Sequence, residues 1–388
     1  MLTPPSPLRS SLQQFGVSVF SRARASLTAS AVSLAQGVPD FDPPPALIEA
    51  AASAMRNGFN QYAPSMGLPL LRIAIATHRE RRYGLTYDPD TEITVTAGAT
   101  EGTWSTATAL LEPGDEAIII EPCYETYAPS VVAAGGVVRF VPTAFPDFRL
   151  DLDGVRRAFT DRTRLVFLNT PSNPSGNCYT YDELAAVGEL CHSYDAYIIA
   201  DETYEHLTYD GVDHLPVAAV PSCRDRTITV GSASKTFSAT GWRIGWALAP
   251  APLTDAVRKV HQFVTFSAPA PLQYAVGSLL VAGFDGYFAD LAAAYAARRD
   301  ILLGYLDGWT ISRPAGGYFL IAACGADDDV AWCADLLASA GVAAIPVSEF
   351  YRGNRSAGRG LVRFAYCKEN ATLHEAGRRL AAYREAHR

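Results

Sequence analysis

The chain has 388 residues, a formal net charge of −8, 49% hydrophobic residues and 19% charged residues. This composition supports a large buried core and excludes wholesale disorder, and the length suits two domains or one domain with a smaller appendage. The acidic balance argues against nucleic acid or an anionic membrane as the main partner.

Seven short runs rich in β-branched or apolar residues cross the middle of the chain, at 92–96, 116–120, 137–141, 164–169, 196–200, 226–230 and 243–248. Helix-like segments separate most of them. One of these, 180–193, begins at Thr180 with Glu183 three residues later, which is the pattern of a capping box. The alternation predicts an α/β fold whose large domain has a seven-stranded, mostly parallel sheet with both faces covered.

From about residue 285 the pattern changes. A long Ala- and Arg-rich helix precedes short strands at 309–312, 318–322, 342–345 and 361–364, and helices close the chain. We therefore expect a large domain at 37–284 and a smaller α+β domain at 285–388. No low-complexity linker separates them, so we expect the two to pack closely.

The seven cysteines are scattered, and none forms a C-x-x-C pair. An odd, scattered set fits neither a disulfide framework nor a cysteine-based zinc site, so we expect free thiols and a cytoplasmic protein. The histidines show no metal-ligand spacing, so we expect no metal, and structural parts for His206 and His261. No apolar run approaches the roughly 18 residues that span a bilayer.

Reactive side chains follow the predicted strands, and in an open α/β sheet ligands bind outside the carboxyl ends of the strands. In chain order these residues are the small-residue loop Gly98, Ala99 and Thr100, then Tyr124, Asn173, Asp201, Tyr204, Ser232, Ser234, Lys235 and Arg243. Pyridoxal phosphate needs this set: an amine for a Schiff base, a carboxylate that keeps the ring nitrogen protonated, donors for the ring oxygen, an aromatic face and a polar nest for the phosphate.

The motifs that carry these residues resemble those of the fold type I, pyridoxal phosphate-dependent aminotransferases of class I/II. They are Asn-x-Pro-x-Asn-Pro-x-Gly at 169–176, Asp-Glu-x-Tyr at 201–204, Ser-x-Ser-Lys at 232–235 and Gly-Trp-Arg-x-Gly at 241–245. Gln-Gly-Val-Pro-Asp-Phe at 36–41 and Val-Arg-Phe at 362–364 resemble the kynurenine (glutamine) and methionine aminotransferase subgroup. The resemblance runs from about residue 16 to the last helix.

The resemblance implies roles for these residues. Lys235 would form the Schiff base and, once freed by substrate, move the proton, while Asp201 would pair with the ring nitrogen. Tyr204 and Asn173 would share the ring oxygen O3′, and Tyr124 would stack on the ring. The phosphate would be held by Gly98, Ala99, Thr100, Ser232, Ser234 and Arg243, with Tyr62 reaching it from the other subunit of a homodimer.

Arg363 would hold the α-carboxylate of the substrate. The resemblance places the rest of the substrate against Val19, Gly37, Tyr62, Asn173, Phe266, Ser267 and Tyr318. This mostly apolar and aromatic set includes no second arginine, so we expect an aromatic, sulfur-containing or glutamine-like L-amino acid. Thr100 and Ser267 depart from the kynurenine enzymes, and Thr100 favours the bacterial methionine type.

The first 39 residues contain three arginines and no Asp or Glu, a composition typical of an organelle transit peptide. The resemblance instead implies that residues 1–36 form an N-terminal segment that packs with the small domain and the substrate site. We therefore expect this segment to belong to the mature protein.

The predicted reaction is a ping-pong transfer of an amino group from an L-amino acid to a 2-oxo acid. Three alternatives stay open. The first is a different pyridoxal phosphate reaction on the same scaffold, β-elimination from cysteine conjugates. An aminotransferase-like transcription regulator needs a DNA-binding module, and only about fifteen residues precede the resemblance. A non-catalytic binding protein is disfavoured because Lys235, Asp201 and Arg363 are all present.

Overall fold

The computed structural model describes residues 9–283 and 285–387. The first eight residues of the expected N-terminal segment, and residue 284 at the expected domain boundary, lie outside the described part. The division of the chain at residues 36 and 284 stays a prediction.

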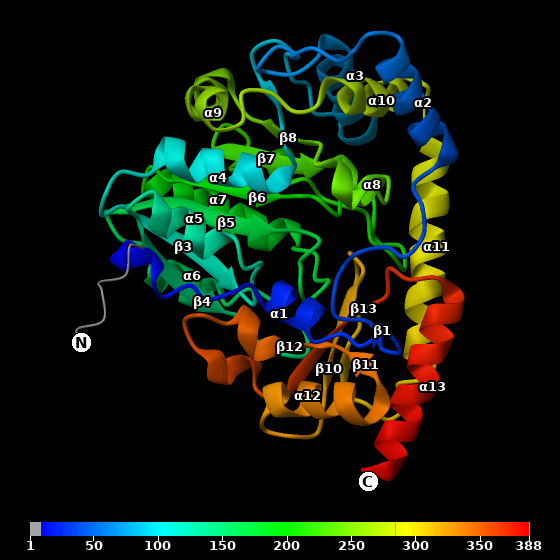
Figure 1. The fold of residues 1–388 in the computed structure, drawn as a ribbon. Coiled ribbons are helices and arrows are strands. Elements are labelled where there is room, and N and C mark those ends of the chain that lie inside the picture. The colour runs from blue at the N-terminus through cyan, green and yellow to red at the C-terminus, as the bar shows by residue number, and fades with distance from the viewer. Residues whose placement is uncertain (1–8, 284, 388) are drawn as a thin grey trace, which may run out of the picture.

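A seven-stranded sheet forms the centre of the larger part of the molecule (Figure 1). Its strands are β2 (Ile93–Thr96), β3 (Glu116–Glu121), β4 (Val137–Pro142), β5 (Thr163–Asn169), β6 (Tyr197–Asp201), β7 (Thr227–Ser232) and β8 (Gly245–Leu248), in the order β2-β8-β7-β6-β5-β3-β4. β8 runs antiparallel to both of its neighbours, β2 and β7, and the other adjacent strands pair in parallel. The predicted α/β fold with a mostly parallel seven-stranded sheet is confirmed.

Helices cover both faces of this sheet. Successive side chains of a strand point to opposite faces, and apolar side chains point to both faces here. Ile118 and Ile120 of β3 face α6 (Leu152–Ala158) and α7 (Tyr181–Ser193), whereas Ala117 and Ile119 face α4 (Ala99–Leu110) and α5 (Tyr127–Ala133). The predicted capping box is present at the start of α7, where the Thr180 hydroxyl accepts a hydrogen bond from the Glu183 N–H. Beyond the β2 edge, the sheet is packed against α2 (Pro45–Arg56), α3 (Pro69–Tyr83) and α10 (Ala270–Val281), and α9 (Ala251–Val264) lies beside β2 and α4.

A second, smaller sheet has the order β12-β13-β10-β9 and is antiparallel. Its strands are β9 (Ile311–Ser312), β10 (Phe319–Ala323), β12 (Ile345–Pro346) and β13 (Leu361–Ala365), and the helices of this region are α11 (Asp285–Leu303), α12 (Asp329–Ala340) and α13 (Asn370–Ala386). The run expected as one strand at 342–345 is two strands, because β11 (Val342–Ala343) pairs with the N-terminal strand β1 (Val32–Ser33) and β12 pairs with β13.

The N-terminal helix α1 (Val19–Ala25) lies between the two sheets (Figure 1). Val19 is buried against Ala343, Ile345 and Phe350, so the start of the chain packs on the small sheet. The remaining regular elements are a four-residue helix, α8 (Ala233–Thr236), and short 3-10 turns at Ser10–Leu12, Val217–Ala219, Thr240–Trp242, Val347–Phe350 and Arg355–Gly358.

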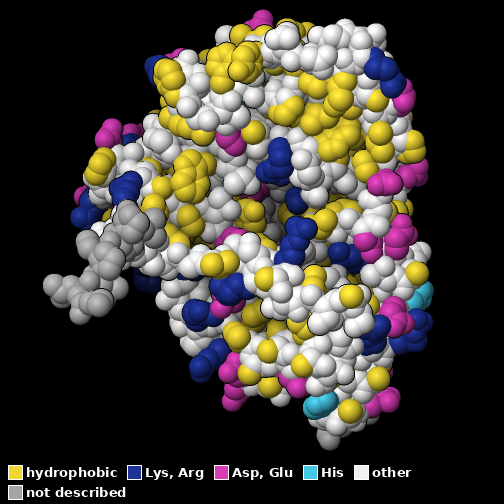
Figure 2. Space-filling view, in the orientation of Figure 1, with side chains coloured by type: hydrophobic (Ala, Val, Ile, Leu, Met, Phe, Trp, Pro, Cys, Tyr) yellow, Lys and Arg dark blue, Asp and Glu magenta, His cyan; other side chains and the backbone are white. Residues whose placement is uncertain are grey.

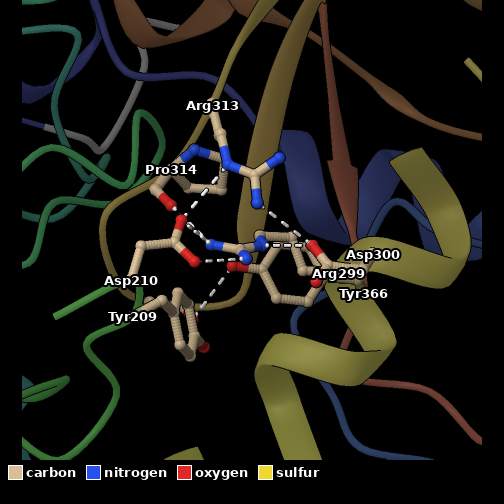
Figure 3. A network of polar contacts seen from close by, with 8 residues as sticks. Tyr209, Asp210, Arg299, Asp300, Arg313, Pro314 and Tyr366 are labelled. Atoms are coloured by element: carbon tan, nitrogen blue, oxygen red, sulfur yellow. Dashed lines mark hydrogen bonds and ion pairs between the residues drawn. The ribbon is translucent and has the colours of Figure 1, made fainter. Parts of the chain in front are cut away.

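An ionic network ties α11 to the loop that follows β6 (Figure 3). Arg299 donates to both carboxylate oxygens of Asp210, each at 2.9 Å, and its Nε donates to Asp300 at 2.9 Å. Arg313 also reaches Asp210, at 3.2 Å. The chain after Arg313 therefore lies against the 204–209 segment, where Gly316 forms a bridge with Thr208. This contact holds the start of β10 beside the carboxyl ends of the large sheet.

No helix among the described residues is by itself long and apolar enough to cross a membrane. One pair, 270–281 and 286–303, passes the length and composition test only when joined, and the two are bent by 99° at the break between them.

Candidate active site

A cavity of about 310 Å³ opens where β5, β6 and β7 end, and Figure 2 shows a hollow at the centre of this face with basic side chains around it. Most of the residues singled out from the sequence line it: Gly37, Ala99, Thr100, Tyr124, Asn173, Asp201, Tyr204, Ser232, Ser234, Lys235, Arg243 and Arg363. Segments up to about 330 residues apart in the chain therefore meet in one hollow, as expected for the carboxyl edge of a parallel sheet.

The other predicted residues do not line the cavity in the single chain. Gly98 ends the loop just before α4, and Tyr318 lies behind the wall, where its hydroxyl donates to the Gly37 carbonyl at 2.9 Å. Val19 turns toward the small sheet, and its neighbour Phe20 lines the cavity instead. Tyr62 is 85% exposed with its ring against Phe266, 5.2 Å between centroids, and Ser267 follows on the same loop.

One end of the cavity is suited to an anion. The first N–H groups of α4 have no partner within the helix, and a helix N-terminus attracts negative charge. Gly98, at a φ of +81°, brings its backbone so close to the Arg243 guanidinium that a Cβ there would collide with it. Arg243 itself adopts a left-handed backbone with a φ of +54°, and such strain is typical of functional sites.

Asp201 lies at the end of β6, buried at 8% exposure. Burial raises the pKa of this carboxyl, while hydrogen bonds from Tyr127 and from the Thr203 N–H, and the charge of Lys235, act in the opposite direction. The Tyr127 hydroxyl donates to Oδ2 at 2.6 Å and the Thr203 N–H to Oδ1 at 3.2 Å. These two donors favour the ionised form that a protonated ring nitrogen requires.

Lys235 follows β7 in the short helix α8, and its side chain faces the cavity. Its Nζ lies 5.9 Å from the ring centre of Tyr204 and 5.7 Å from that of Tyr318. Burial lowers the pKa of this amine to about 8, since the low-dielectric surroundings disfavour its charge.

Arg363 is fully buried on β13 of the small sheet. Its Nη1 donates to Asn173 Oδ1 at 2.8 Å and its Nη2 to the Ala35 carbonyl at 2.6 Å. The guanidinium lies 4.0 Å from the ring centre of Phe319. Burial lowers the pKa of Arg363 to about 10, so the group remains a cation at neutral pH.

Several residues of the cavity wall were not singled out from the sequence: Phe20, Gln36, Val38, Thr103, Thr126, Tyr127, Asn169, Thr203 and Phe319. Tyr127 matters most because its hydroxyl donates to Asp201, and its place three residues after Tyr124 was the available signal. Asn169, at the first position of its motif, donates to the Asp201 carbonyl at 2.8 Å and accepts from the Asn173 N–H at 2.6 Å.

One group among the described residues has the composition of a metal site, although the sequence led us to expect none. The side chains of His78, Glu205 and His206 place one ligand atom each within 4.8 Å of one another. Arg79 already forms ion pairs with Glu205 at 3.1 Å and with Glu202 at 2.9 Å, so the local carboxylates have a cationic partner. None of these residues lines the cavity.

The cavity wall fits pyridoxal phosphate. Two buried polar atoms there have no hydrogen-bond partner in the described structure, Ser234 Oγ near the anion end and Arg363 Nε at the opposite wall. A phosphate would be received by Ser234, Arg243 and the start of α4, and a substrate carboxylate by Arg363. Lys235 and Asp201 would supply the amine and the ring-nitrogen partner that this cofactor requires.

Comparison with known proteins agrees with this chemistry. Residues 29–380 match the family model described as aminotransferase class I and II. The chain is 42% identical to a probable N-succinyldiaminopimelate aminotransferase of Mycobacterium tuberculosis, covering 97% of this chain and 98% of that protein. It is 40% identical to the methionine aminotransferase of Escherichia coli, covering 96% and 97%, and 35% identical to kynurenine–oxoglutarate transaminase 1 of Rattus norvegicus, covering 91% and 92%.

Solved structures agree as well. The N-succinyldiaminopimelate aminotransferase from Mycobacterium tuberculosis superposes with a TM-score of 0.93 at 43% identity, over 97% of this chain and 99% of that one. An Escherichia coli methionine aminotransferase gives a TM-score of 0.92 at 38% identity, over 97% and 100%. The cofactor and the transamination reaction expected from the sequence are thereby confirmed, and the chain belongs to the class I and II aminotransferases, the pyridoxal phosphate-dependent transaminases.

Proposed function

We propose that this transaminase takes its amino group from an aromatic, sulfur-containing or glutamine-like L-amino acid. The observation that carries the proposal is the meeting of Lys235, Asp201 and Arg363 on the walls of one cavity whose other surfaces include Phe20, Val38 and Phe319. An apolar wall beside a single carboxylate clamp favours a substrate with one carboxylate and an uncharged side chain.

Each of the three residues has one task in this proposal. Pyridoxal phosphate, when bound, supplies an electron-accepting ring that stabilises negative charge on the substrate Cα. Asp201, whose ionised form is favoured by the hydrogen bonds from Tyr127 and the Thr203 N–H, holds the proton on the ring nitrogen. Arg363 would bind the α-carboxylate and so fix the orientation of the substrate Cα in the cavity.

Lys235 accepts and returns the Cα proton, and its lowered pKa suits that task. With a pKa of about 8, roughly one amine in ten is neutral at pH 7 in the cofactor-free protein. An ordinary lysine would be neutral in fewer than about one molecule in a thousand. The burial that lowers the pKa therefore increases the supply of basic amine by more than about a hundredfold.

The burial of the Lys235 amine also lowers the stability of the folded, cofactor-free protein at neutral pH. Below pH 8 the folded cofactor-free protein holds a buried charge, and above it the folded state loses the proton while the unfolded state keeps it up to about pH 10.5. We therefore expect cofactor-free Lys235→Met to be more stable than the cofactor-free wild type at pH 7, and the gap to shrink between pH 8 and 10.5. Urea unfolding midpoints of both proteins at pH 7 and 9.5 measure this, and a gap independent of pH would contradict the assigned shift.

Removing the amine tests the role of Lys235 itself. Lys235→Ala should lose the visible absorbance band of the covalently bound cofactor and, with it, transamination, because no other amine among the described residues lines the cavity. Far-UV circular dichroism should stay unchanged, since the side chain only lines a cavity. A variant that kept the band and turned over would exclude Lys235 as the attachment point.

The substrate class is tested by a half-reaction screen. Wild-type holoenzyme mixed with single amino acids should lose the visible band fastest with methionine, aromatic amino acids or glutamine, and slowly with aspartate or glutamate. Fast reaction with dicarboxylic amino acids would overturn the substrate proposal.

The variant Arg363→Lys tests the carboxylate clamp. Lysine keeps the positive charge but loses the two parallel N–H donors of the guanidinium, so the apparent KM for the best donor should rise by roughly 10- to 100-fold, the equivalent of about 1.5–3 kcal/mol.

The names of the similar enzymes do not choose among substrates: methionine and kynurenine have uncharged side chains, whereas N-succinyldiaminopimelate carries further carboxylates. We infer a cytoplasmic location from the seven free cysteines.

We also propose that the enzyme works as a homodimer. Exposed apolar side chains gather around α9 and the loop that follows it, with Phe263 and Tyr62 each 85% exposed, Val264 60% and Phe266 46%. Figure 2 shows hydrophobic side chains over the part of the molecule that holds α2, α3, α9 and α10. Apolar side chains gathered in this way support a second copy as the occupant of the patch, with Tyr62 completing the partner's phosphate site.

Subunit complementation tests this arrangement. Tyr62→Ala and Lys235→Ala chains, co-expressed with different tags, should each be poorly active alone. Hybrid dimers isolated through both tags contain one site with both defects and one intact site, so their activity should recover to about half of the wild type. Hybrids without recovered activity would place Tyr62 and Lys235 in the same site of one chain.

A further inference from the structure

His206 joins two parts of the active site that lie far apart in the sequence. It follows Tyr204 by two residues, and it is buried with its ring stacked on Phe288 at 4.1 Å between centroids. Its Nδ1 lies 3.0 Å from the Thr236 hydroxyl, and Thr236 directly follows Lys235. Its Nε2 lies 2.9 Å from Nε2 of His78.

One assignment of the protons satisfies all of these contacts. If the Thr236 hydroxyl donates to the Ser232 carbonyl, 3.3 Å away, its oxygen accepts from His206, whose proton then lies on Nδ1. The Nε2 of a neutral His206 then accepts from His78. Burial holds the pKa of His206 well below its usual range, although Glu205 acts in the opposite direction, so the neutral ring is the form present at pH 7.

The helical turn that carries Lys235 depends on such outside contacts. Helix α8 has four residues, too few to be stable by itself. Thr236, the last residue of α8, has two such contacts: the Tyr287 hydroxyl donates to its carbonyl at 3.0 Å, and His206 Nδ1 lies 3.0 Å from its hydroxyl.

His206 lies in a turn that internal hydrogen bonds and ion pairs hold in place. The turn that begins at Asp201 is closed by the bond from the Glu205 N–H to the Glu202 carbonyl at 3.0 Å and from the Leu207 N–H to the Tyr204 carbonyl at 2.8 Å. Glu202 and Glu205 are both buried and both paired with Arg79. This one turn therefore places Asp201 and Tyr204 in the cavity and His206 beneath α8.

We propose that His206 is a positioning residue for transamination: its Nδ1–H holds the Thr236 hydroxyl and thereby fixes the turn that presents Lys235 to the cofactor. The inference rests on the proposed role of Lys235. A metal ion shared by His78, Glu205 and His206 is the competing use of the same side chains. The Arg79 guanidinium, already 3.1 Å from Glu205, opposes a second cation there.

The test uses variants that separate the two ring nitrogens of His206. Asparagine places an N–H donor where Nδ1 lies, whereas glutamine places one where Nε2 lies, so only His206→Asn can still hold Thr236. Thr236→Val removes the other partner with little change of shape. His192→Gln, an exposed histidine at the end of α7, is the matched control.

We expect His206→Gln and Thr236→Val to lower the half-reaction rate constant by roughly 10- to 100-fold, because a displaced amine reacts slowly, with less than about a threefold change in KM. His206→Asn should stay within about threefold of the wild type, and the double variant His206→Gln/Thr236→Val should be no worse than either single variant. The pH midpoint of the cofactor's visible band should shift in the Gln and Val variants and not in His206→Asn or His192→Gln.

Several results would overturn the proposal. Equal losses in His206→Asn and His206→Gln would make the residue merely structural, and so would effects of His206→Gln and Thr236→Val that multiply. One equivalent of Zn²⁺ bound by the wild type but not by His78→Gln in calorimetry would make the cluster a metal site. If His206→Gln does not fold by circular dichroism, an unshifted band and an unchanged rate in Thr236→Val decide against the proposal. Loss of the band in Lys235→Ala beside an unaffected Thr236→Val would remove this inference and leave the role of Lys235 intact.

Discussion

The site depends on keeping one carboxylate ionised where water is excluded. Burial raises the pKa of Asp201, and the groups that oppose this are two hydrogen-bond donors and the distant charge of Lys235, whose own pKa burial lowers. Each charge is thus destabilised by the cavity and stabilised by the other, without a direct ion pair between them. A cationic ring nitrogen placed against Asp201, as proposed above, would complete this field.

Hydrogen bonds between backbone segments fix the distances between the residues of the site. Asn169 and Asp201 are register partners on neighbouring strands, so their separation is fixed by sheet geometry and not by side-chain packing. Arg363 comes from the other sheet, and its bonds to Asn173 and to the Ala35 carbonyl tie three distant segments together. The Arg299–Asp210 pair does the same at the other end of the 204–210 loop (Figure 3). A shift of either sheet therefore moves the carboxylate clamp relative to Asp201.

The sequence predicts the sheet well because its signal is local. All seven strands of the large sheet lie within two residues of the expected runs, and Lys235, Asp201 and Arg363 meet as the motifs indicate. What was missed is set by tertiary packing. Tyr127 has no motif of its own, and whether Val19 or Phe20 reaches the cavity depends on the rotation of α1 against the small sheet. The split of 342–345 into two strands likewise follows from the available partners, β1 and β13.

Three acids in one short segment show how partners, and not sequence position, decide the state of a buried group. Burial alone would raise the pKa of Asp201, Glu202 and Glu205 alike. Arg79 reverses this for Glu202 and Glu205, whose pKa values lie below the usual range, so these two acids are permanent anions that anchor the turn. No arginine of the described residues pairs with Asp201, whose carboxylate accepts from Tyr127 and from the Thr203 N–H instead. Within this segment, the ion pairs of Glu202 and Glu205 with Arg79 supply rigidity, while Asp201, stabilised by hydrogen bonds and not by an ion pair, is the acid proposed for the chemistry.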